Sequence, residues 1–211
     1  MILITEQEIF AKRGQRFICW TRRILLLAGV LALAYVALTL FNARLFQNAA
    51  SRALDGQIHA EELHTVIPAR KSVKEGDLLG RMEIPRIGLS VMVLQGTSSK
   101  TLRLGVGHIS GTALPGESGN IGIAGHRDTF FRSLKNIHRE DEILLQTTAG
   151  IARYEVDWIQ ITAPGDSGIV STATESGLTL VTCYPFYYIG AAPERFVVHA
   201  HRLRQTEAGG R

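Results

Sequence analysis

A cysteine and an arginine flank one short loop near the C-terminus, in the segment LTLVTCYPFYYIGAAPERFVVHA. The β-rich run 178–182 ends at Cys183, and Arg195 begins a second β-rich run after a loop that contains proline and glycine. Two strands joined in this way pair as neighbours, so Arg195 should return towards Cys183. Because a cation beside a thiol favours the reactive thiolate, the segment predicts a nucleophile and its electrostatic partner in one hairpin.

Both residues also have an ordinary interpretation. A free cysteine is among the most buried residue types and usually packs as a small apolar side chain. An isolated arginine is usually a solvated surface charge. The strand-end position of Cys183, with Arg195 opening the next strand, favours catalysis more than either residue does alone.

A cysteine nucleophile needs a partner acid and base, and the chain has seven histidines. Five of them lie in a predicted stalk, a charged stretch or the last strand: His59, His64, His138, His199 and His201. His126 follows the apolar run 121–124 and Gly125, so it stands at a strand end as Cys183 does, whereas His108 lies in a loop with no strand directly in front of it. Rigid strand ends hold catalytic groups best, which favours His126 over His108. An ordinary surface histidine remains the alternative for both.

An apolar stretch near the N-terminus is long enough to span a bilayer. Residues 24–41, ILLLAGVLALAYVALTLF, are 18 residues without a charge. Basic residues precede this stretch more densely than they follow it: Lys12, Arg13, Arg16, Arg22 and Arg23 before, Arg44 and Arg52 after. Because positive residues stay on the cytoplasmic side, we expect a single-pass anchor in the cytoplasmic membrane, with the N-terminus inside and the following domain outside. A cleaved signal peptide is the alternative, but the apolar core is longer than usual and residues 48–50 are a weak cleavage site.

Charge and cysteine usage narrow the choice of function further. The net charge of +4 is modest, and the basic residues do not form a long patch interleaved with aromatics, so nothing indicates a nucleic-acid surface. Of the two cysteines, Cys19 falls on the predicted inner side and Cys183 on the outer side. They cannot pair, and Cys183 is therefore predicted to be an unpaired, reactive thiol outside the cytoplasm.

The distribution of apolar, charged and turn-forming residues predicts five segments. They are a cytosolic tail (1–23), the transmembrane anchor (24–41), a juxtamembrane helix and linker (42–76) acting as a stalk or brace, a β-rich domain (77–205) and a C-terminal tail (206–211). In the β-rich domain, short apolar runs alternate with glycine and proline turns, which is typical of an all-β barrel or sandwich. Helices should be few and short, and residues 130–137, after Asp128 or Thr129 as N-cap, are the best candidate.

Two segments carry a family resemblance. GTALPGESGNIGIAGHRDTFF and LTLVTCYPFYYIGAAPERFVVHA resemble the signature regions of sortases, the membrane-anchored cysteine transpeptidases, and most of all those of class D. The histidine loop, the T-L-V-T-C strand and the following arginine occur in the family's order, with an anchor in front. The resemblance covers about residues 78 to 203. It implies an eight-stranded sortase-type β-barrel with one or two short helices, and it selects His126 as the histidine.

The resemblance also implies roles for single residues. Cys183 would be the nucleophile, and His126 the general acid for the leaving amine and then the base for the incoming one. Arg195 would bind the substrate backbone and stabilise the oxyanion. Thr182 would contact the substrate or the oxyanion, and Asp128 would have a supporting role, holding the loop after His126.

The implied substrate is a protein that ends in an LPXTG-like sorting signal. Cleavage at Thr-Gly would give a thioester, and an amine on a peptidoglycan precursor or a pilin subunit would resolve it. The aromatic, proline-bearing loop 184–194 would form one wall of the groove and grip the apolar Leu-Pro segment, through Tyr184, Pro185, Phe186, Tyr187 and Tyr188. Simple packing of this loop on the barrel is the alternative.

No cofactor is required by this chemistry, and no metal site is predicted. Some sortases use Ca²⁺ held by loop carboxylates, but Glu117 and Glu175 alone do not make such a site. The rival enzymes are an L,D-transpeptidase or another cysteine peptidase. The L,D-transpeptidase pattern, however, sets its histidine and cysteine close together in an S-H-G-x-x-G-C order that is not seen here. A membrane-tethered binding domain with an inert Cys183 is the rival outside enzymes.

Overall fold

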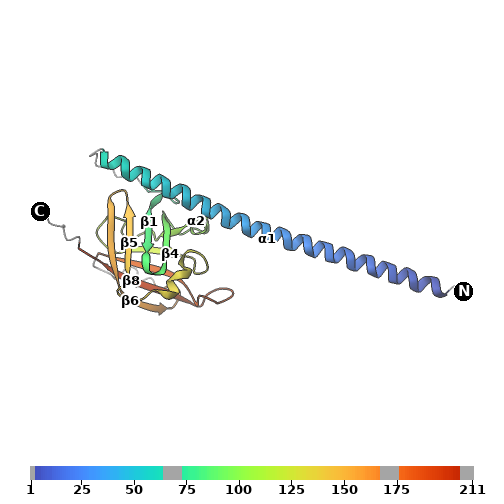
Figure 1. Cartoon of the computed structure of the whole chain (residues 1–211). Helices are drawn as coiled ribbons and strands as arrows, with labels where there is room; N and C mark the ends of the chain where they lie inside the picture. Colours follow the sequence, from blue (N-terminus) through green and yellow to red (C-terminus); the bar gives the residue numbers. More distant parts are fainter. Residues whose placement is uncertain (1–2, 64–72, 167–175, 205–211) are drawn as a thin grey trace. The chain divides into compact units, whose positions relative to one another are not determined.

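The computed structural model describes residues 3–63, 73–166 and 176–204 (Figure 1). The chain divides into two units, Met1–Arg44 and Leu45–Arg211. Helix α1 (Leu3–Leu63) runs without a break through the predicted tail, anchor and juxtamembrane segments. Most of the predicted linker lies in residues 64–72, and that part, like the C-terminal tail 206–211, lies outside the described residues.

The described part of the N-terminal unit belongs to α1 and includes the apolar stretch predicted as the anchor. The helix is long and apolar enough over Ile18–Ile58 to cross a membrane, and its most apolar window is not buried in the structure. Large apolar side chains such as Leu25 and Leu31 are about 70% exposed, at 72% and 69%. A helix that exposes apolar side chains on all faces is typical of a membrane span. The predicted anchor at residues 24–41 lies inside the stretch Ile18–Ile58.

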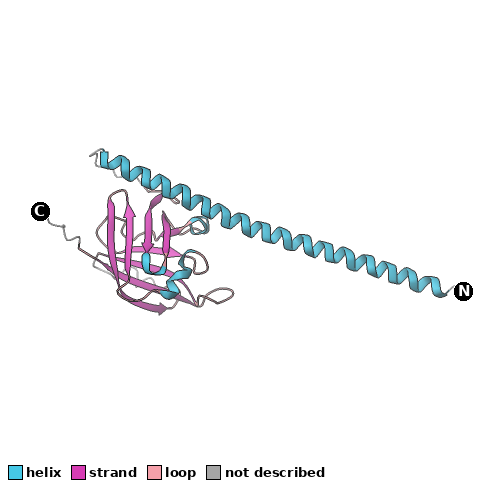
Figure 2. Ribbon diagram, viewed as in Figure 1, coloured by secondary structure: helices cyan, strands magenta, loops and turns pink. Residues whose placement is uncertain are grey.

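The second unit is a closed β-barrel of eight strands, which confirms the predicted fold class (Figure 2). The strands are β1 (Leu78–Ile84), β2 (Leu89–Gln95), β3 (Val106–His108), β4 (Ile121–Gly125), β5 (Glu142–Thr147), β6 (Gly150–Thr162), β7 (Gly177–Tyr184) and β8 (Glu194–Arg202). Their order around the barrel is β1-β2-β3-β4-β7-β8-β6-β5, and β1 pairs with β5 to close it.

Helices are few in the described part of the barrel, as predicted, although there are three. They are α2 (Ser99–Leu104) and the 3-10 helices η1 (Pro85–Ile87) and η2 (Phe130–Asn136). The helix predicted at residues 130–137 is η2. Thr129 is at its N-cap position but makes no capping hydrogen bond with its side chain. The strand β3 was not predicted, because three residues including a glycine are too short to show a strand pattern. His108 therefore lies in a strand and not in a loop.

Alternation of side chains along the strands builds the core and sets the face of each site residue. On β7, Leu178 and Leu180 are fully buried in the core and Thr182 is 3% exposed. These three residues share one face of the strand. Cys183 therefore lies on the opposite, outer face.

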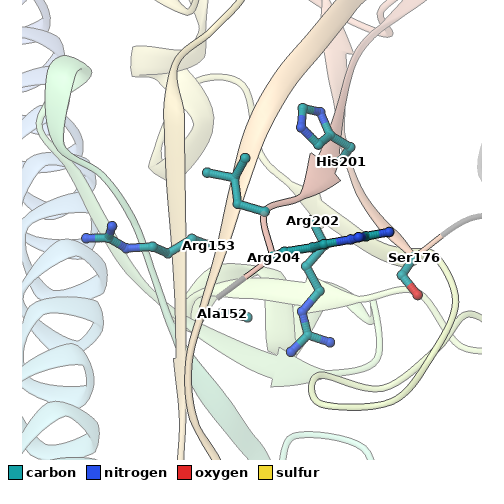
Figure 3. Close-up of a pocket in the computed structure, with 7 residues that line it drawn as sticks. Ala152, Arg153, Ser176, His201, Arg202 and Arg204 are labelled. Carbon is teal, nitrogen blue, oxygen red and sulfur yellow. The ribbon is translucent and has the colours of Figure 1, made fainter. Parts of the chain in front are cut away.

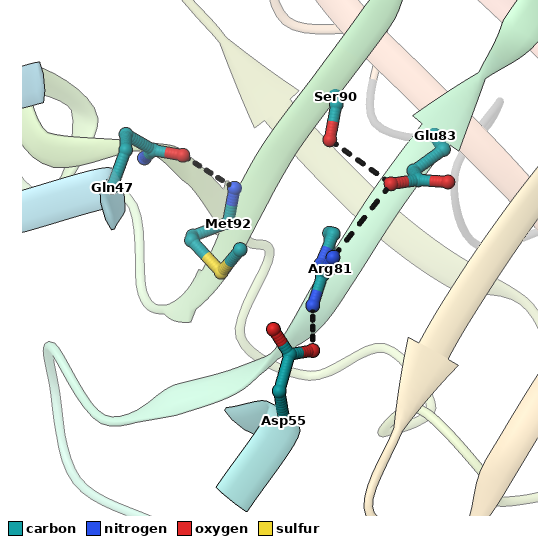
Figure 4. A network of polar contacts seen from close by, with 6 residues as sticks. All are labelled: Gln47, Asp55, Arg81, Glu83, Ser90 and Met92. Atoms are coloured by element: carbon teal, nitrogen blue, oxygen red, sulfur yellow. Dashed lines mark hydrogen bonds and ion pairs between the residues drawn. The ribbon is translucent and has the colours of Figure 1, made fainter. Parts of the chain in front are cut away.

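The part of α1 in the second unit packs against the barrel wall. Leu54 is 1% exposed, and the Gln47 side chain accepts a hydrogen bond from the Met92 backbone N–H at 2.9 Å. Asp55 forms an ion pair with Arg81 of β1, whose side chain is 16% exposed (Figure 4). This segment braces the barrel through both apolar burial and paired polar groups.

Candidate active site

The parallel pairing of β4 and β7 brings the histidine to the cysteine. The register runs from Ile121 opposite Leu178 to Gly125 opposite Thr182. His126 is the residue after Gly125, and Cys183 is the residue after Thr182. Because parallel strands in register carry neighbouring residues on the same face, these two residues lie side by side at one end of the barrel. Both are half-buried.

The antiparallel pairing of β7 and β8 adds the arginine. Cys183 and Arg195 are directly opposed in the register, as expected for the hairpin. Directly opposed residues of an antiparallel pair project from the same face, with Cβ atoms about 4.5–5.5 Å apart. Cys183 is a free thiol. Three adjacent strands thus bring His126, Cys183 and Arg195 together on one outer edge.

Thr182 locks the two strands that carry this pair of residues. Its hydroxyl donates a buried hydrogen bond of 2.7 Å to the carbonyl oxygen of Gly125. The bond joins β7 to β4 immediately before Cys183 and His126. Thr182 was expected to contact the substrate, but its side chain is buried on the face opposite Cys183, and it acts in this structure as a link between the strands.

The Arg195 guanidinium is bound to its own loop. Its Nη1 donates to the carbonyl oxygens of Ala192 at 3.3 Å and Glu194 at 2.9 Å. Arg195 is half-buried. The group that stands opposite the thiol therefore holds backbone carbonyls of the β7–β8 loop, which we define as residues 185–193, and of the first residue of β8.

The aromatic residues after Cys183 divide into a packed base and an exposed tip. Tyr184 and Phe186 pack on each other and on Phe196, with ring centroids 5.1 to 6.1 Å apart. Phe186 also packs against the barrel core. Pro185, between these two residues in the sequence, is half-buried. The tip of the loop is solvent-facing: Tyr187, Tyr188 and Ile189 are 72%, 49% and 97% exposed.

One residue near the site was not singled out from the sequence. Arg127, directly after His126, donates from Nη2 to the carbonyl oxygens of Tyr188 at 2.7 Å and Gly190 at 3.0 Å. Its guanidinium also lies 5.9 Å from the centre of the Tyr188 ring. The sequence shows an arginine beside the histidine and an aromatic loop far along the chain, but no local pattern predicts that the two are in contact. Asp128 is exposed in the same turn.

His108, the other candidate histidine, is a buried structural residue. It is 1% exposed, and its ring nitrogens lie 3.0 Å from Gln95 Oε1 and 2.9 Å from the Ala113 carbonyl oxygen. Burial lowers the pKa of His108 below its ordinary value, against smaller raising effects of Ala113 and Glu117. A neutral, enclosed ring of this kind holds the loop before β4 in place.

The cavity shown in Figure 3 lies elsewhere, with a volume of about 710 Å³. Its lining includes three arginines, Arg153, Arg202 and Arg204, together with Ala152, Ser176, His201 and Leu203. His201 pairs with Gly177 at the start of β7, whereas Cys183 is near its end. The cavity is therefore at the other end of this strand from the thiol. Among the described residues, no group of three or more His, Cys, Asp or Glu side chains is arranged to hold a metal ion.

Comparisons with known proteins identify the family of this barrel. The family model "Sortase domain" matches residues 82–203. Sortase D of Bacillus subtilis (strain 168) is 36% identical over 129 residues, which is 61% of this chain and 65% of that protein. The curated relatives are matched over 38% to 65% of their own length, less than two thirds in each case.

Solved structures show the same fold. A Clostridium perfringens Sortase D5 transpeptidase is 26% identical, with a TM-score of 0.61, over 76% of this chain and 98% of that chain. Clostridium perfringens sortase C with the C-terminal cell wall sorting motif is 27% identical, with a TM-score of 0.58, over 72% of this chain and 88% of that one. The family match begins within β1 and continues past the end of β8, so it covers the segments that carry His126, Cys183 and Arg195. This chain belongs to the sortase family.

Proposed function

We propose that this protein is a cysteine transpeptidase that cleaves an LPXTG-like sorting signal between Thr and Gly. The observation that carries the proposal is the meeting of three strand ends: Cys183 is directly opposed to Arg195, and His126 and Cys183 each follow the last paired residues of β4 and β7. A nucleophile, a proton carrier and a fixed cation on one edge are the groups that acyl transfer needs.

In the first half-reaction, the Cys183 thiolate attacks the threonine carbonyl carbon and a C–S bond forms. Negative charge develops on the carbonyl oxygen, where the Arg195 guanidinium and a backbone N–H stabilise it. Loss of one such donor typically costs about 100- to 1,000-fold in rate. The C–N bond then breaks, His126 donates a proton to the departing glycine amine, and a thioester remains.

In the second half-reaction, an amine attacks the thioester carbon and His126 takes a proton from it. The C–S bond breaks, Cys183 leaves as the thiolate, and the substrate is joined to the amine. Water in place of the amine gives hydrolysis. The thioester conserves much of the free energy of the peptide bond, so the cycle needs no ATP, and no step requires a metal or cofactor.

In this mechanism Arg195 exchanges loop carbonyls for the substrate. In the free protein its Nη1 holds the carbonyl oxygens of Ala192 and Glu194. A bound substrate supplies a competing carbonyl on the edge that Arg195 shares with Cys183. The planar fork of arginine can hold a backbone carbonyl and an oxyanion together, which a lysine cannot do.

Two observations support the choice of substrate. The similar sortase C of Clostridium perfringens was solved with the C-terminal cell wall sorting motif. In this chain the exposed tip residues Tyr187, Tyr188 and Ile189 offer an apolar surface beside the thiol strand, suited to the Leu-Pro part of such a motif. The acceptor would be an amine of a peptidoglycan precursor or of a pilin subunit.

Membrane anchoring completes the proposal. Residues 24–41 would hold the enzyme at the cytoplasmic membrane with its N-terminus inside and the barrel outside. A substrate held by its own C-terminal tail would share that surface. Enzyme and substrate would then meet at a raised effective concentration.

Incubation with an LPXTG peptide and an amine tests the proposal, with a muropeptide as the rival substrate. We expect cleavage of the LPXTG peptide and a product joined to the amine. Cleavage of the muropeptide alone would indicate an L,D-transpeptidase. In parallel, iodoacetamide should label Cys183 in the native fold, and complete resistance to labelling would contradict its role as nucleophile.

A further inference from the structure

The β7–β8 loop is held by basic residues from two sides. Arg195 binds the carbonyl oxygens of Ala192 and Glu194, at the end where the loop enters β8. Arg127 binds the carbonyl oxygens of Tyr188 and Gly190, near the exposed tip. The two arginines therefore grip different parts of one loop, and only Arg127 comes from the histidine-bearing segment.

A second contact reinforces the grip of Arg127. Lys135 of η2 donates from Nζ to the Tyr187 hydroxyl at 2.5 Å, and the same ammonium lies 5.1 Å from the centre of the Tyr187 ring. This hydrogen bond and the charge of Lys135 lower the pKa of the Tyr187 hydroxyl. Because η2 begins at Phe130, both contacts join the segment directly after His126 to the tip of the loop.

We propose that Arg127 and Lys135 are positioning residues that clasp the β7–β8 loop to the histidine segment, and so hold one wall of the substrate groove. The proposal rests on the transpeptidase function stated above. In the proposed mechanism Arg195 releases the loop carbonyls as it turns to the substrate. The clasp keeps the wall in place at that moment, when the loop would otherwise lose its hold near β8.

The chemistry of the clasp makes Arg127 difficult to replace. One guanidinium nitrogen spans two backbone carbonyls while the group lies over the Tyr188 ring, a combination that suits a planar cation. Its Nη1 is buried without a hydrogen-bond partner among the described residues, which offsets part of the gain. Lysine would avoid that unmet donor but would lose the planar contact with the ring, so Arg127→Lys should retain only part of the hold.

Chymotrypsin measures the clasp without reference to catalysis, because it cleaves after Tyr187 and Tyr188 when the loop is free. We expect Arg127→Met to be cleaved severalfold faster than the parent, and Arg127→Lys at an intermediate rate. Arg139→Met, at an exposed arginine beyond η2, is the matched control and should be cleaved like the parent. Lys135→Met, an exposed change that does not threaten folding, should also accelerate cleavage. Unchanged cleavage in both Arg127→Met and Lys135→Met overturns the clasp.

Steady-state kinetics with an LPXTG peptide then test the groove wall. Arg127→Met should raise KM about tenfold, with a smaller effect on kcat, because the loss falls mainly on substrate binding. Arg127→Lys should restore part of the difference, and Arg139→Met should match the parent. If chymotrypsin cleaves Arg127→Met faster but the KM for the peptide is unchanged, the loop does not act as a wall of the substrate groove. If chymotrypsin cleaves Arg127→Met faster but the parent does not turn over the peptide, the proposed function is contradicted and the clasp is still supported.

Discussion

Cys183 and Arg195 are directly opposed residues of the antiparallel pair β7 and β8. This relationship fixes the cation on the same outer face as the thiol, with no intervening residue. It does not depend on the conformation of the loop between them, because both residues belong to the strands. The proposed oxyanion group is therefore positioned by the barrel itself, and only its side-chain partners have to change.

Arg195→Lys should lower kcat by about 100-fold or more, because the lysine keeps the charge but cannot hold two oxygens in a fork. Peptide turnover measured beside Arg139→Lys, a surface control, checks this. Thermal unfolding should show that both variants stay folded. Near-normal turnover in Arg195→Lys would mean that charge alone is sufficient and that the fork has no role.

Thr182→Val should lower kcat/KM about tenfold and stability by about 1–2 kcal/mol, because it removes the hydroxyl that donates to the Gly125 carbonyl in a buried site. Thr182→Ser keeps the hydroxyl and should retain most activity. Urea unfolding and peptide turnover measure the two effects separately. A valine variant that loses stability but keeps full activity would show that the link holds the fold without aligning Cys183 and His126.

The barrel should lose stability as the solution is made acidic. Burial is the main cause that lowers the pKa of His108 and of His199 in the folded state. Nearby Glu117 opposes the shift at His108; at His199, Asp157 opposes the shift and His201 adds to it. The unfolded chain then binds protons at higher pH, so the stability is present above the ordinary value of 6.5 and is lost as the pH falls through the folded values.

Urea unfolding at about pH 7.5 and about pH 5.5 checks this dependence across the histidine range. The urea midpoint of the parent should fall between the two conditions. His108→Gln should be less stable at the higher pH but should show a smaller fall on acidification. An equal fall in the parent and in His108→Gln would exclude this residue as a source of the acid sensitivity.

Asp55→Ala should weaken the brace between α1 and β1. It removes the nearer carboxylate from the mostly buried guanidinium of Arg81 and leaves only Glu83, at 4.0 Å, at a cost of about 1 kcal/mol and a fall in Tm of about 2–4 °C. Differential scanning calorimetry of the full chain measures the change. Asp166→Ala, at an exposed turn, is the control, and an equal Tm for both variants would show that the ion pair adds nothing.

Much of the fold followed from local patterns. Most strands of the barrel were predicted from short apolar runs separated by glycine and proline turns. The Cys183–Arg195 pair was predicted because one residue ends a strand, the other begins the next strand, and a short loop joins them. The face of Thr182 could also have been read from the alternation of Leu178, Leu180 and Thr182. That alternation places it with the core residues and away from the thiol.

Other parts had no local signal. β4 and β7 pair in parallel although β5 and β6 lie between them in sequence, so a long-range strand pairing brings His126 beside Cys183. The contact of Arg127 with the β7–β8 loop depends on the same long-range pairing. Position along the chain therefore only favoured His126 over His108, and the family resemblance was needed to select it.

Intact-mass spectrometry of the protein with an LPXTG peptide and no amine tests the central claim most directly. The account predicts a covalent adduct with the mass of the acyl part of the peptide, which an added amine discharges. The adduct should form in Cys19→Ala and be absent in Cys183→Ala. An adduct that persists in Cys183→Ala, or the lack of any adduct while the peptide is being cleaved, would contradict a thioester at Cys183.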